Sequence, residues 1–83
     1  MALYFITYDL RKSRDYETLY SKLEEYNAVR ILESTWCFNR FNTSATGLRD
    51  YFKNYIDGDD AIIVSEVTNW ASTGTLGNPN QLK

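Results

Sequence analysis

The sequence contains no histidine and only one cysteine among its 83 residues. Without histidine, the chain can form neither a Ser-His-Asp triad nor a zinc site with imidazole ligands. A single cysteine excludes an internal disulfide and a metal site with four thiolates. Because a short chain without a disulfide framework is typical of a reducing compartment, we expect a cytoplasmic protein.

Long apolar runs and an excess of charge of one sign are lacking as well. No segment approaches the roughly 18 apolar residues of a membrane-spanning helix, and no basic residue precedes the apolar run at the start, so we expect neither a membrane contact nor a signal peptide. Nine Lys and Arg residues against eleven Asp and Glu residues give a net charge of −2. A strongly basic domain would indicate nucleic-acid binding. This chain would have to bind nucleic acid through a local basic patch or a metal ion.

Aromatic side chains, in contrast, are abundant. The chain has seven Tyr, four Phe and two Trp residues, which make up 16% of its length. So many rings need either a core or a partner surface to cover them. A mass of 9.7 kDa allows one small domain, whose buried area is marginal, so that association with a second chain would add stability.

Hydrophobic periodicity predicts four strands and two amphipathic helices. We expect strands over residues 3–8, 29–32, 35–41 and 61–67, and helices over residues 15–26 and 48–56. The order βαββαβ is that of a ferredoxin-like α+β fold, with a four-stranded antiparallel sheet and two helices on one face. Residues 1–76 would form this domain, and the polar residues 77–83 a flexible C-terminal tail.

The first predicted strand, with the sequence LYFITY, is apolar on both of its alternating faces. Such a strand lies in the middle of a sheet and is covered on both sides. Since the two helices cover one side only, a second copy of the chain is the simplest cover for the other. We therefore expect a homodimer that associates through the sheet face opposite the helices.

Three segments carry a resemblance to a known family: the opening YFITYDL, the junction Glu33-Ser34-Thr35-Trp36, and the stretch from Trp70 to Gly74. Over residues 3–76 the chain resembles the small CRISPR-associated adaptation nuclease superfamily. It looks most like the stand-alone members labelled SinR, which are relatives of the virulence-associated protein D toxins. Members of this superfamily are ferredoxin-like homodimers whose sheets face each other. Some hold DNA beside an integrase without catalysis, and the toxins cut RNA.

The resemblance implies a site at the end of the first strand. In the family, the aspartate at this position from each subunit lies near the two-fold axis, and the pair is thought to bind a divalent metal for phosphodiester hydrolysis. The matching residue here is Asp9, which would be catalytic and would ligate Mg²⁺ or Mn²⁺ with its symmetry mate. The family's tail adds a strand to the partner's sheet. Residues 68–76 match that segment, and we expect Trp70 to lie in the dimer interface.

The residues around Asp9 leave alternatives open. One carboxylate does not hold Mg²⁺ in a catalytic geometry, so Asp9 forms a metal site only in a dimer, or else it caps the loop or pairs with a nearby cation. The next cations, Arg11, Lys12 and Arg14, either hold the phosphates of RNA or DNA or are the solvated charges of a loop. The ring of Tyr8 either stacks with a base or belongs to the core or the dimer interface.

Two functional hypotheses of different classes follow. The first is a metal-dependent endonuclease that hydrolyses RNA or DNA. The alternative is a non-catalytic dimeric scaffold that binds nucleic acid, a nucleotide, or a protein such as an integrase. The acidic composition and the short polar tail after Gly77 argue against a large platform for duplex DNA.

Other chemically distinctive residues favour structural roles. Cys37 lies within a predicted strand and has no histidine to activate it, so we expect a buried thiol. The acidic segment DGDD, residues 57–60, lacks the spacing of a calcium-binding loop and indicates the end of a helix and the entry to a strand. We expect the tyrosines at helical spacing to lie in the core: Tyr16, Tyr20, Tyr51 and Tyr55.

We predict that the protein is a dimer at micromolar concentration, because one face of its first strand has no other cover. Light scattering or sedimentation should then report a mass near twice 9.7 kDa. A monomer under these conditions would contradict the prediction and would also remove the paired-carboxylate site.

Overall fold

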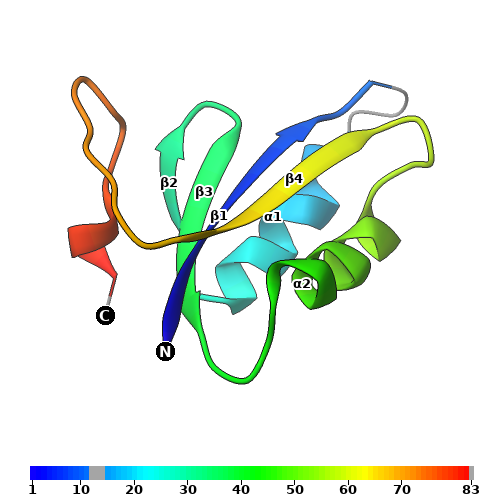
Figure 1. The fold of residues 1–83 in the computed structure, drawn as a ribbon. Coiled ribbons are helices and arrows are strands. Elements are labelled where there is room, and N and C mark those ends of the chain that lie inside the picture. The colour runs from blue at the N-terminus through cyan, green and yellow to red at the C-terminus, as the bar shows by residue number, and fades with distance from the viewer. Residues whose placement is uncertain (12–14, 83) are drawn as a thin grey trace.

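The first strand lies in the interior of a four-stranded sheet. In the computed structural model, which describes residues 1–11 and 15–82, the strands are β1 (Ala2–Asp9), β2 (Val29–Leu32), β3 (Thr35–Arg40) and β4 (Ala61–Val67). Their order in the sheet is β2-β3-β1-β4, and every neighbouring pair is antiparallel (Figure 1). Both helices lie on the same side of this sheet. The predicted ferredoxin-like α+β fold is confirmed.

Each helix begins at a capping side chain. The carboxylate of Asp15 accepts a hydrogen bond from the amide of Thr18 at 3.2 Å, and α1 (Tyr16–Glu25) follows. The hydroxyl of Ser44 accepts from the amide of Gly47 at 3.0 Å, and α2 (Ala45–Phe52) follows. Such caps satisfy amides that have no partner inside the helix. The second helix begins and ends earlier than expected, and the chain continues from it into the 3₁₀ turn η1 (Lys53–Tyr55).

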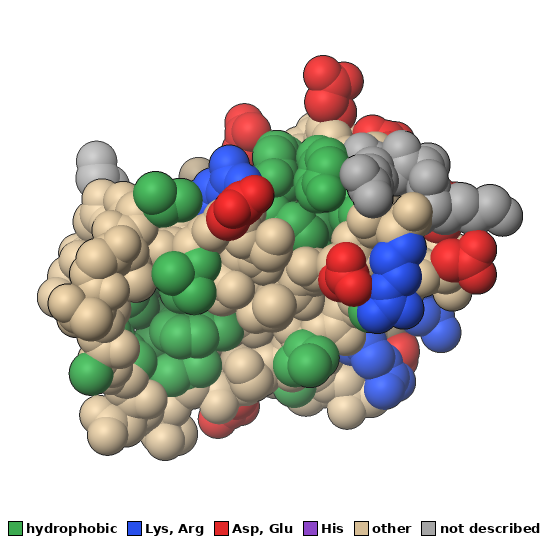
Figure 2. Space-filling model, turned by 90° about the horizontal axis from the view of Figure 1, so that it is seen from above, with side chains coloured by type: hydrophobic (Ala, Val, Ile, Leu, Met, Phe, Trp, Pro, Cys, Tyr) green, Lys and Arg blue, Asp and Glu red, His purple; other side chains and the backbone are tan. Residues whose placement is uncertain are grey.

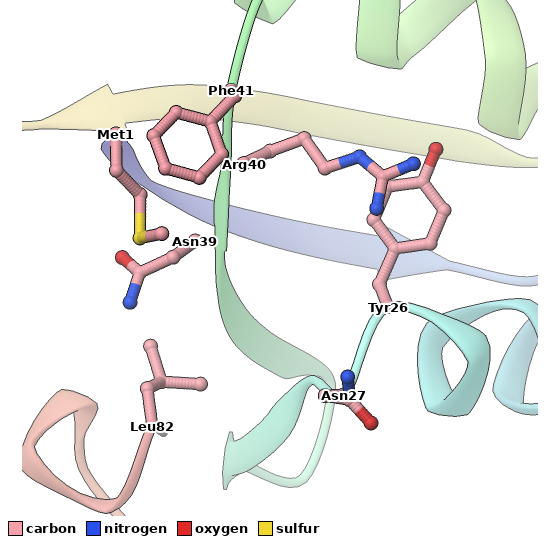
Figure 3. A pocket seen from close by; sticks show the side chains of 7 residues that line it. All are labelled: Met1, Tyr26, Asn27, Asn39, Arg40, Phe41 and Leu82. Carbon is pink, nitrogen blue, oxygen red and sulfur yellow. The ribbon is translucent and has the colours of Figure 1, made fainter.

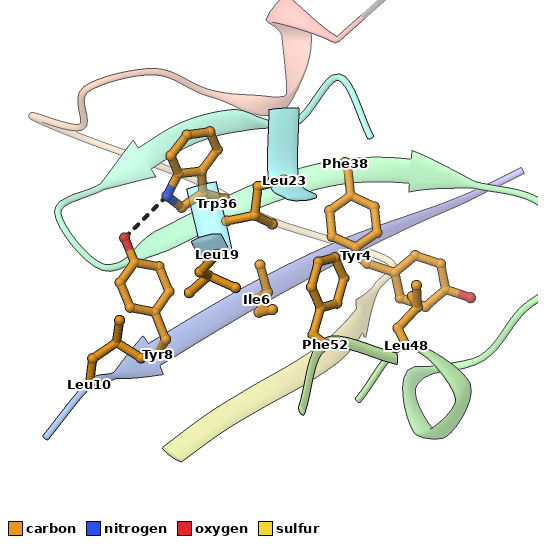
Figure 4. Close-up of a cluster of buried hydrophobic side chains, with 10 residues drawn as sticks. All are labelled: Tyr4, Ile6, Tyr8, Leu10, Leu19, Leu23, Trp36, Phe38, Leu48 and Phe52. Atoms are coloured by element: carbon orange, nitrogen blue, oxygen red, sulfur yellow. Dashed lines mark hydrogen bonds between the residues drawn. The ribbon is translucent and has the colours of Figure 1, made fainter. Parts of the chain in front are cut away.

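The helices cover one face of the sheet with a largely aromatic core (Figure 4). On β1, the alternate residues Tyr4, Ile6 and Tyr8 face the helices, and each is at most 4% exposed. Seven further side chains complete this cluster: Leu10, Leu19, Leu23, Trp36, Phe38, Leu48 and Phe52.

The tyrosines of the two helices lie less deeply than their spacing predicts. Tyr20, Tyr51 and Tyr55 are half-buried at the margin of the core. Tyr16 is 39% exposed, so its predicted core position is wrong. Tyr16 lies in the first turn of α1 at the edge of the core, where its ring packs against the rings of Tyr8 and Tyr20.

The opposite face of the sheet is partly covered by the chain's own C-terminal segment, residues 68–82. Trp70 and the residues after it enclose a cavity of about 300 Å³ together with Phe5 and Ile31 of the sheet. The amide of Leu76 donates to the carbonyl of Ile31 at 2.9 Å, which fixes the segment to the edge of β2. On this face Ile31 is 6% exposed, whereas Ile63 of β4 is 68% exposed. Only the half of the face next to β4, which carries Ile63, therefore remains open.

The segment ends in the 3₁₀ turn η2 (Pro79–Gln81). Asn78 and Gln81 cap this turn reciprocally: the amide of Asn80 donates to Asn78 Oδ1 at 2.9 Å, and the amide of Asn78 donates to Gln81 Oε1 at 2.7 Å. In the structure this end of the chain lies beside β2 (Figure 1). The flexibility expected of residues 77–83 stays a prediction.

Gly77 lies close against β2, and we predict that Gly77→Ala loosens the C-terminal segment. A Cβ atom there would lie 2.8 Å from the carbonyl oxygen of Arg30 and 3.0 Å from Val29 Cγ1. Overpacking of this kind costs about 1–3 kcal/mol. Urea denaturation should show this loss, and hydrogen exchange at the amide of Leu76 should become faster.

Gly58→Ala is the matched control, because a Cβ atom at Gly58 would meet nothing within 4 Å. That substitution should leave stability unchanged or raise it slightly, since alanine restricts the unfolded chain. Equal stability and equal exchange in the two variants would show that the segment is not held at Gly77.

Candidate active site at the end of the first strand

Asp9 ends β1 on the face of the sheet that the helices leave open. It pairs with Ala61 of β4, and it shares its face with Leu3, Phe5 and Thr7 because side chains alternate along a strand. The Asp9 side chain is 65% exposed. Figure 2 views the molecule from the end toward which β1 runs, and acidic and basic side chains lie close together on its right-hand side. Asp9 is thus accessible to a ligand or to a second chain.

The carboxylate of Asp9 pairs with the next cation along the chain. Arg11 Nε donates to Asp9 Oδ2 at 2.9 Å, and the Arg11 side chain is 59% exposed. An ion pair this exposed contributes about 0–1 kcal/mol, because water screens both charges. The pairing is one of the two roles that the sequence left open for Asp9. The ion pair is weak enough for the Asp9 carboxylate to exchange Arg11 for a more strongly bound ligand.

Asp60 holds the loop that carries Arg11. Asp60 Oδ1 accepts a hydrogen bond from the backbone amide of Arg11 at 2.6 Å, and Asp60 Oδ2 accepts one from the amide of Asp57 at 2.9 Å. One carboxylate therefore joins the loop after β1 to the turn before β4. The acidic segment 57–60 was predicted to be a strand entry, but the sequence contained no signal that its last residue would reach a loop 49 positions earlier.

Tyr8 lies on the other face of β1 from Asp9, at the centre of a buried hydrogen-bond network. Its hydroxyl accepts from Trp36 Nε1 at 3.2 Å (Figure 4) and donates to the hydroxyl of Tyr20 at 2.9 Å. Arg30 donates to the same Tyr20 hydroxyl at 3.1 Å. Burial raises the pKa of Tyr8, and the hydrogen bond with Tyr20 raises it further.

Base stacking requires an open ring face, and the ring of Tyr8 is turned into the core with 4% of the residue exposed. Tyr8 is accordingly no part of the nucleic-acid surface proposed below. Of the three cations assigned to that surface, Arg11 is in place beside Asp9. Lys12 and Arg14 lie outside the described residues.

Residues 1–73 match the family model described as CRISPR associated protein Cas2. The chain belongs to the Cas2 family. No solved structure matches it. The resemblance drawn from the residues around Asp9 and Trp70 is confirmed, and the matched range includes all four strands and both helices of this Cas2-family chain.

The described residues offer a divalent metal ion one suitable ligand at this site and not a complete set of protein ligands. Within the described part of this Cas2-family chain, no group of three or more His, Cys, Asp and Glu side chains is placed to hold a metal ion. Asp9 offers an exposed carboxylate, which is the hard oxygen ligand that Mg²⁺ and Mn²⁺ prefer. It fits such an ion as one ligand among several.

Two other residues singled out in the sequence have clear positions. Cys37 is fully buried in β3, and burial raises the pKa of its thiol to about 11, so the expected buried structural thiol is confirmed. Trp70 is half-buried against its own sheet, and its role in a dimer interface stays a prediction.

No helix among residues 1–11 and 15–82 is both long enough and apolar enough to cross a membrane.

We predict that Tyr8→Phe destabilises the fold, because it leaves Trp36 Nε1 buried without an acceptor. An unsatisfied buried donor costs about 1–3 kcal/mol. Tyr16→Phe is the control, since the Tyr16 hydroxyl makes no hydrogen bond with any described residue and the residue is 39% exposed. Equal stability of the two variants in urea would remove the structural role of Tyr8.

The raised pKa of Tyr8 predicts a difference in alkaline solution as well. An unfolded tyrosine ionises near pH 10, whereas the buried hydroxyl keeps its proton to higher pH. The unfolded chain therefore loses the proton first, and the stability that Tyr8 contributes falls as the pH rises above about 10. Wild type should lose more stability than Tyr8→Phe between pH 9 and about 11.

Proposed function

We propose that this Cas2-family chain acts as a homodimeric, metal-dependent phosphodiesterase on RNA or DNA, with Asp9 as the catalytic carboxylate. The observation that supports the proposal is the position of Asp9. It is 65% exposed at the strand end, on the face of the sheet that has no helix over it. Two chains meeting through this face about a two-fold axis would bring two such carboxylates together.

The open half of the sheet face is suited to that association. Ile63 is 68% exposed and is the Cα partner of Thr7 on β1, two residues along the strands from the pair Asp9 and Ala61. An exposed apolar side chain next to a carboxylate gives the dimer an apolar contact and leaves the charged end of the strand at its margin. The metal would be Mg²⁺ or Mn²⁺, held by Asp9 and its symmetry mate.

In this proposal Asp9 and Arg11 have different roles. A divalent ion bound there supplies Lewis-acid polarisation of the phosphate and a more acidic water. Asp9 holds the ion, and Arg11, which already lies 2.9 Å from Asp9, turns its guanidinium to the phosphate oxygens as negative charge builds on them. Hydrolysis adds water across one P–O bond and leaves a phosphate on one product and a hydroxyl on the other.

A second function, that of a non-catalytic scaffold, has its own supporting observation. Asp9 is the sole acidic residue of β1, and its carboxylate is already paired with Arg11. If that pair persists in the dimer, the same face would serve only to bind nucleic acid, a nucleotide or a protein such as an integrase. The two functions differ in their response to metal.

We predict that Asp9→Asn abolishes metal-dependent hydrolysis, with a loss of about 100-fold or more. Single-stranded RNA, single-stranded DNA and duplex are incubated with Mg²⁺ or Mn²⁺ and with either protein. In parallel, metal should stabilise wild type by roughly 2.7 kcal/mol at a concentration 100 times its Kd, measured as a rise in Tm. Without metal, Asp9→Asn should melt at the same temperature or higher, since two like charges no longer repel each other.

Asp50→Asn is the matched control. Asp50 pairs with Arg49 at 2.9 Å, with side-chain exposures of 55% and 52%, so it reproduces the geometry of the Asp9 pair at another place. This variant should keep both the hydrolysis and the metal response. A wild type whose melting and nuclease activity are both indifferent to metal would refute the catalytic proposal and favour the scaffold.

A further inference from the structure

A second hollow lies at the opposite end of the sheet from Asp9. Its volume is about 350 Å³, and it opens where β3 continues past the start of β2 (Figure 3). Val29, the first residue of β2, pairs with Cys37, so the edge of β3 beyond Cys37 has no strand beside it. Arg40 at this end pairs with Ala2, and seven residue steps along β1 separate Ala2 from Asp9, roughly 24 Å. The hollow is therefore distinct from the candidate active site.

One cation, Arg40, is held at this hollow. Its guanidinium lies 4.1 Å from the centre of the Tyr26 ring, within the range of a cation–π contact. The Tyr26 ring is in turn fixed by the core, with ring centres of Phe38 and Phe52 at 5.2 and 5.3 Å. Stacking on a ring leaves the N–H groups at the rim of the guanidinium free to bind an anion. The core thus orients Arg40 before any ligand arrives.

The charge of Arg40 is uncompensated within the described residues. Arg11, Lys22 and Arg49 each pair with a carboxylate, whereas Arg40 makes no ion pair or hydrogen bond with any residue in the ranges 1–11 and 15–82. None of the seven residues that line the hollow has an acidic side chain, and Arg40 has the one charged side chain among them, close to the N-terminal ammonium of Met1. In a chain with a net charge of −2, this is a local site for an anion.

The other walls suit a flat, partly polar group. Phe41 directly follows Arg40, the last residue of β3, and is 60% exposed, so its ring offers a face for stacking. The amide side chains of Asn27 and Asn39 also border the hollow, and such amides can both donate to and accept from the edge of a base. Asn27 lies two residues past the end of α1 at a φ of 56°, and its backbone amide donates to the carbonyl of Glu24 at 2.9 Å.

We propose that this hollow binds a nucleotide, with its phosphate on Arg40 and its base against Phe41. Arginine and phosphate match each other in geometry and charge, and aromatic rings stack with any base. The nucleotide is either free or the terminal nucleotide of a strand, because the recognised chemistry is the same. The inference does not depend on catalysis at Asp9.

The test titrates the full-length protein with AMP, adenosine and inorganic phosphate, using calorimetry or NMR shifts. AMP should bind at least tenfold more tightly than either fragment, because only AMP engages both Arg40 and Phe41. Arg40→Gln and Phe41→Ala should each weaken AMP binding at least tenfold. Phe41 is largely exposed, so its truncation leaves the core intact, and a thermal melt of each variant verifies the fold.

Matched controls separate this site from other surface groups. Arg49→Gln removes an exposed arginine elsewhere, and Tyr16→Ala removes an exposed ring on α1. Both variants, and also Asp9→Asn, should bind AMP as wild type does. The proposal is overturned if AMP does not bind at millimolar concentration, if phosphate alone binds as well as AMP, or if the controls lose as much affinity as Arg40→Gln.

Competition distinguishes the two sources of the nucleotide. A short oligonucleotide with a 5′-phosphate should displace AMP if the hollow receives the end of a strand, and the same oligonucleotide with a 5′-hydroxyl should not. Displacement by neither oligonucleotide, with AMP still bound through Arg40 and Phe41, assigns the site to the free nucleotide. Equal displacement by both oligonucleotides would contradict recognition of the phosphate by Arg40.

Discussion

The alternation of side chains along β1 is the constraint on which the rest of this molecule depends. Tyr4, Ile6 and Tyr8 point into the helix-covered core, and the residues between them, ending with Asp9, point to the other face. A shift of register by one residue would exchange the two sets. It would place a carboxylate among aromatic rings and leave the Tyr8 hydroxyl outside its network. The same packing that forms the core therefore fixes Asp9 on the open face.

Polar contacts close both ends of the aromatic core. At one end, the hydroxyl of Tyr8 and the indole of Trp36 satisfy each other, and Arg30 reaches the network through Tyr20 and through the carbonyl of Glu33. At the other end, the guanidinium of Arg40 lies on the ring of Tyr26. Tyrosine and tryptophan can be buried because their polar atoms find partners. Within the described residues, no buried side-chain nitrogen or oxygen is without a hydrogen bond.

The two arginines at these ends differ in what they leave available. Arg30 donates to groups of its own chain, so it is a structural residue in this structure. Arg40 rests on a ring, and a ring uses the face of the guanidinium and leaves its rim open. This difference is the physical basis for assigning a ligand to Arg40 and none to Arg30. The length of β1 separates the proposed nucleotide site from Asp9.

The C-terminal segment changes the expected division of the sheet faces. Because both faces of β1 are apolar, each must be covered. The helices were expected to cover one face and a second copy of the chain the other. The structure shows that residues 68–82 of the same chain cover the half of this face next to β2, including Phe5 of β1. The half that remains open carries Ile63 and Asp9. Any association of two chains through this face thus has a smaller apolar surface than the sequence implied.

The sequence by itself determined the order of the elements, the ferredoxin-like topology, the buried thiol of Cys37 and the family, because each follows from local periodicity or from short segments. The tertiary structure alone decided which groups meet across long separations. Asp60 reaches the amide of Arg11, Leu76 reaches Ile31, and the ring of Tyr26 lies under Arg40. These contacts depend on the register of paired strands and on where the helices end, and neither is encoded in the residues next to the contact. The sequence could therefore name Asp9, but not its surroundings or the hollow at the other end of the sheet.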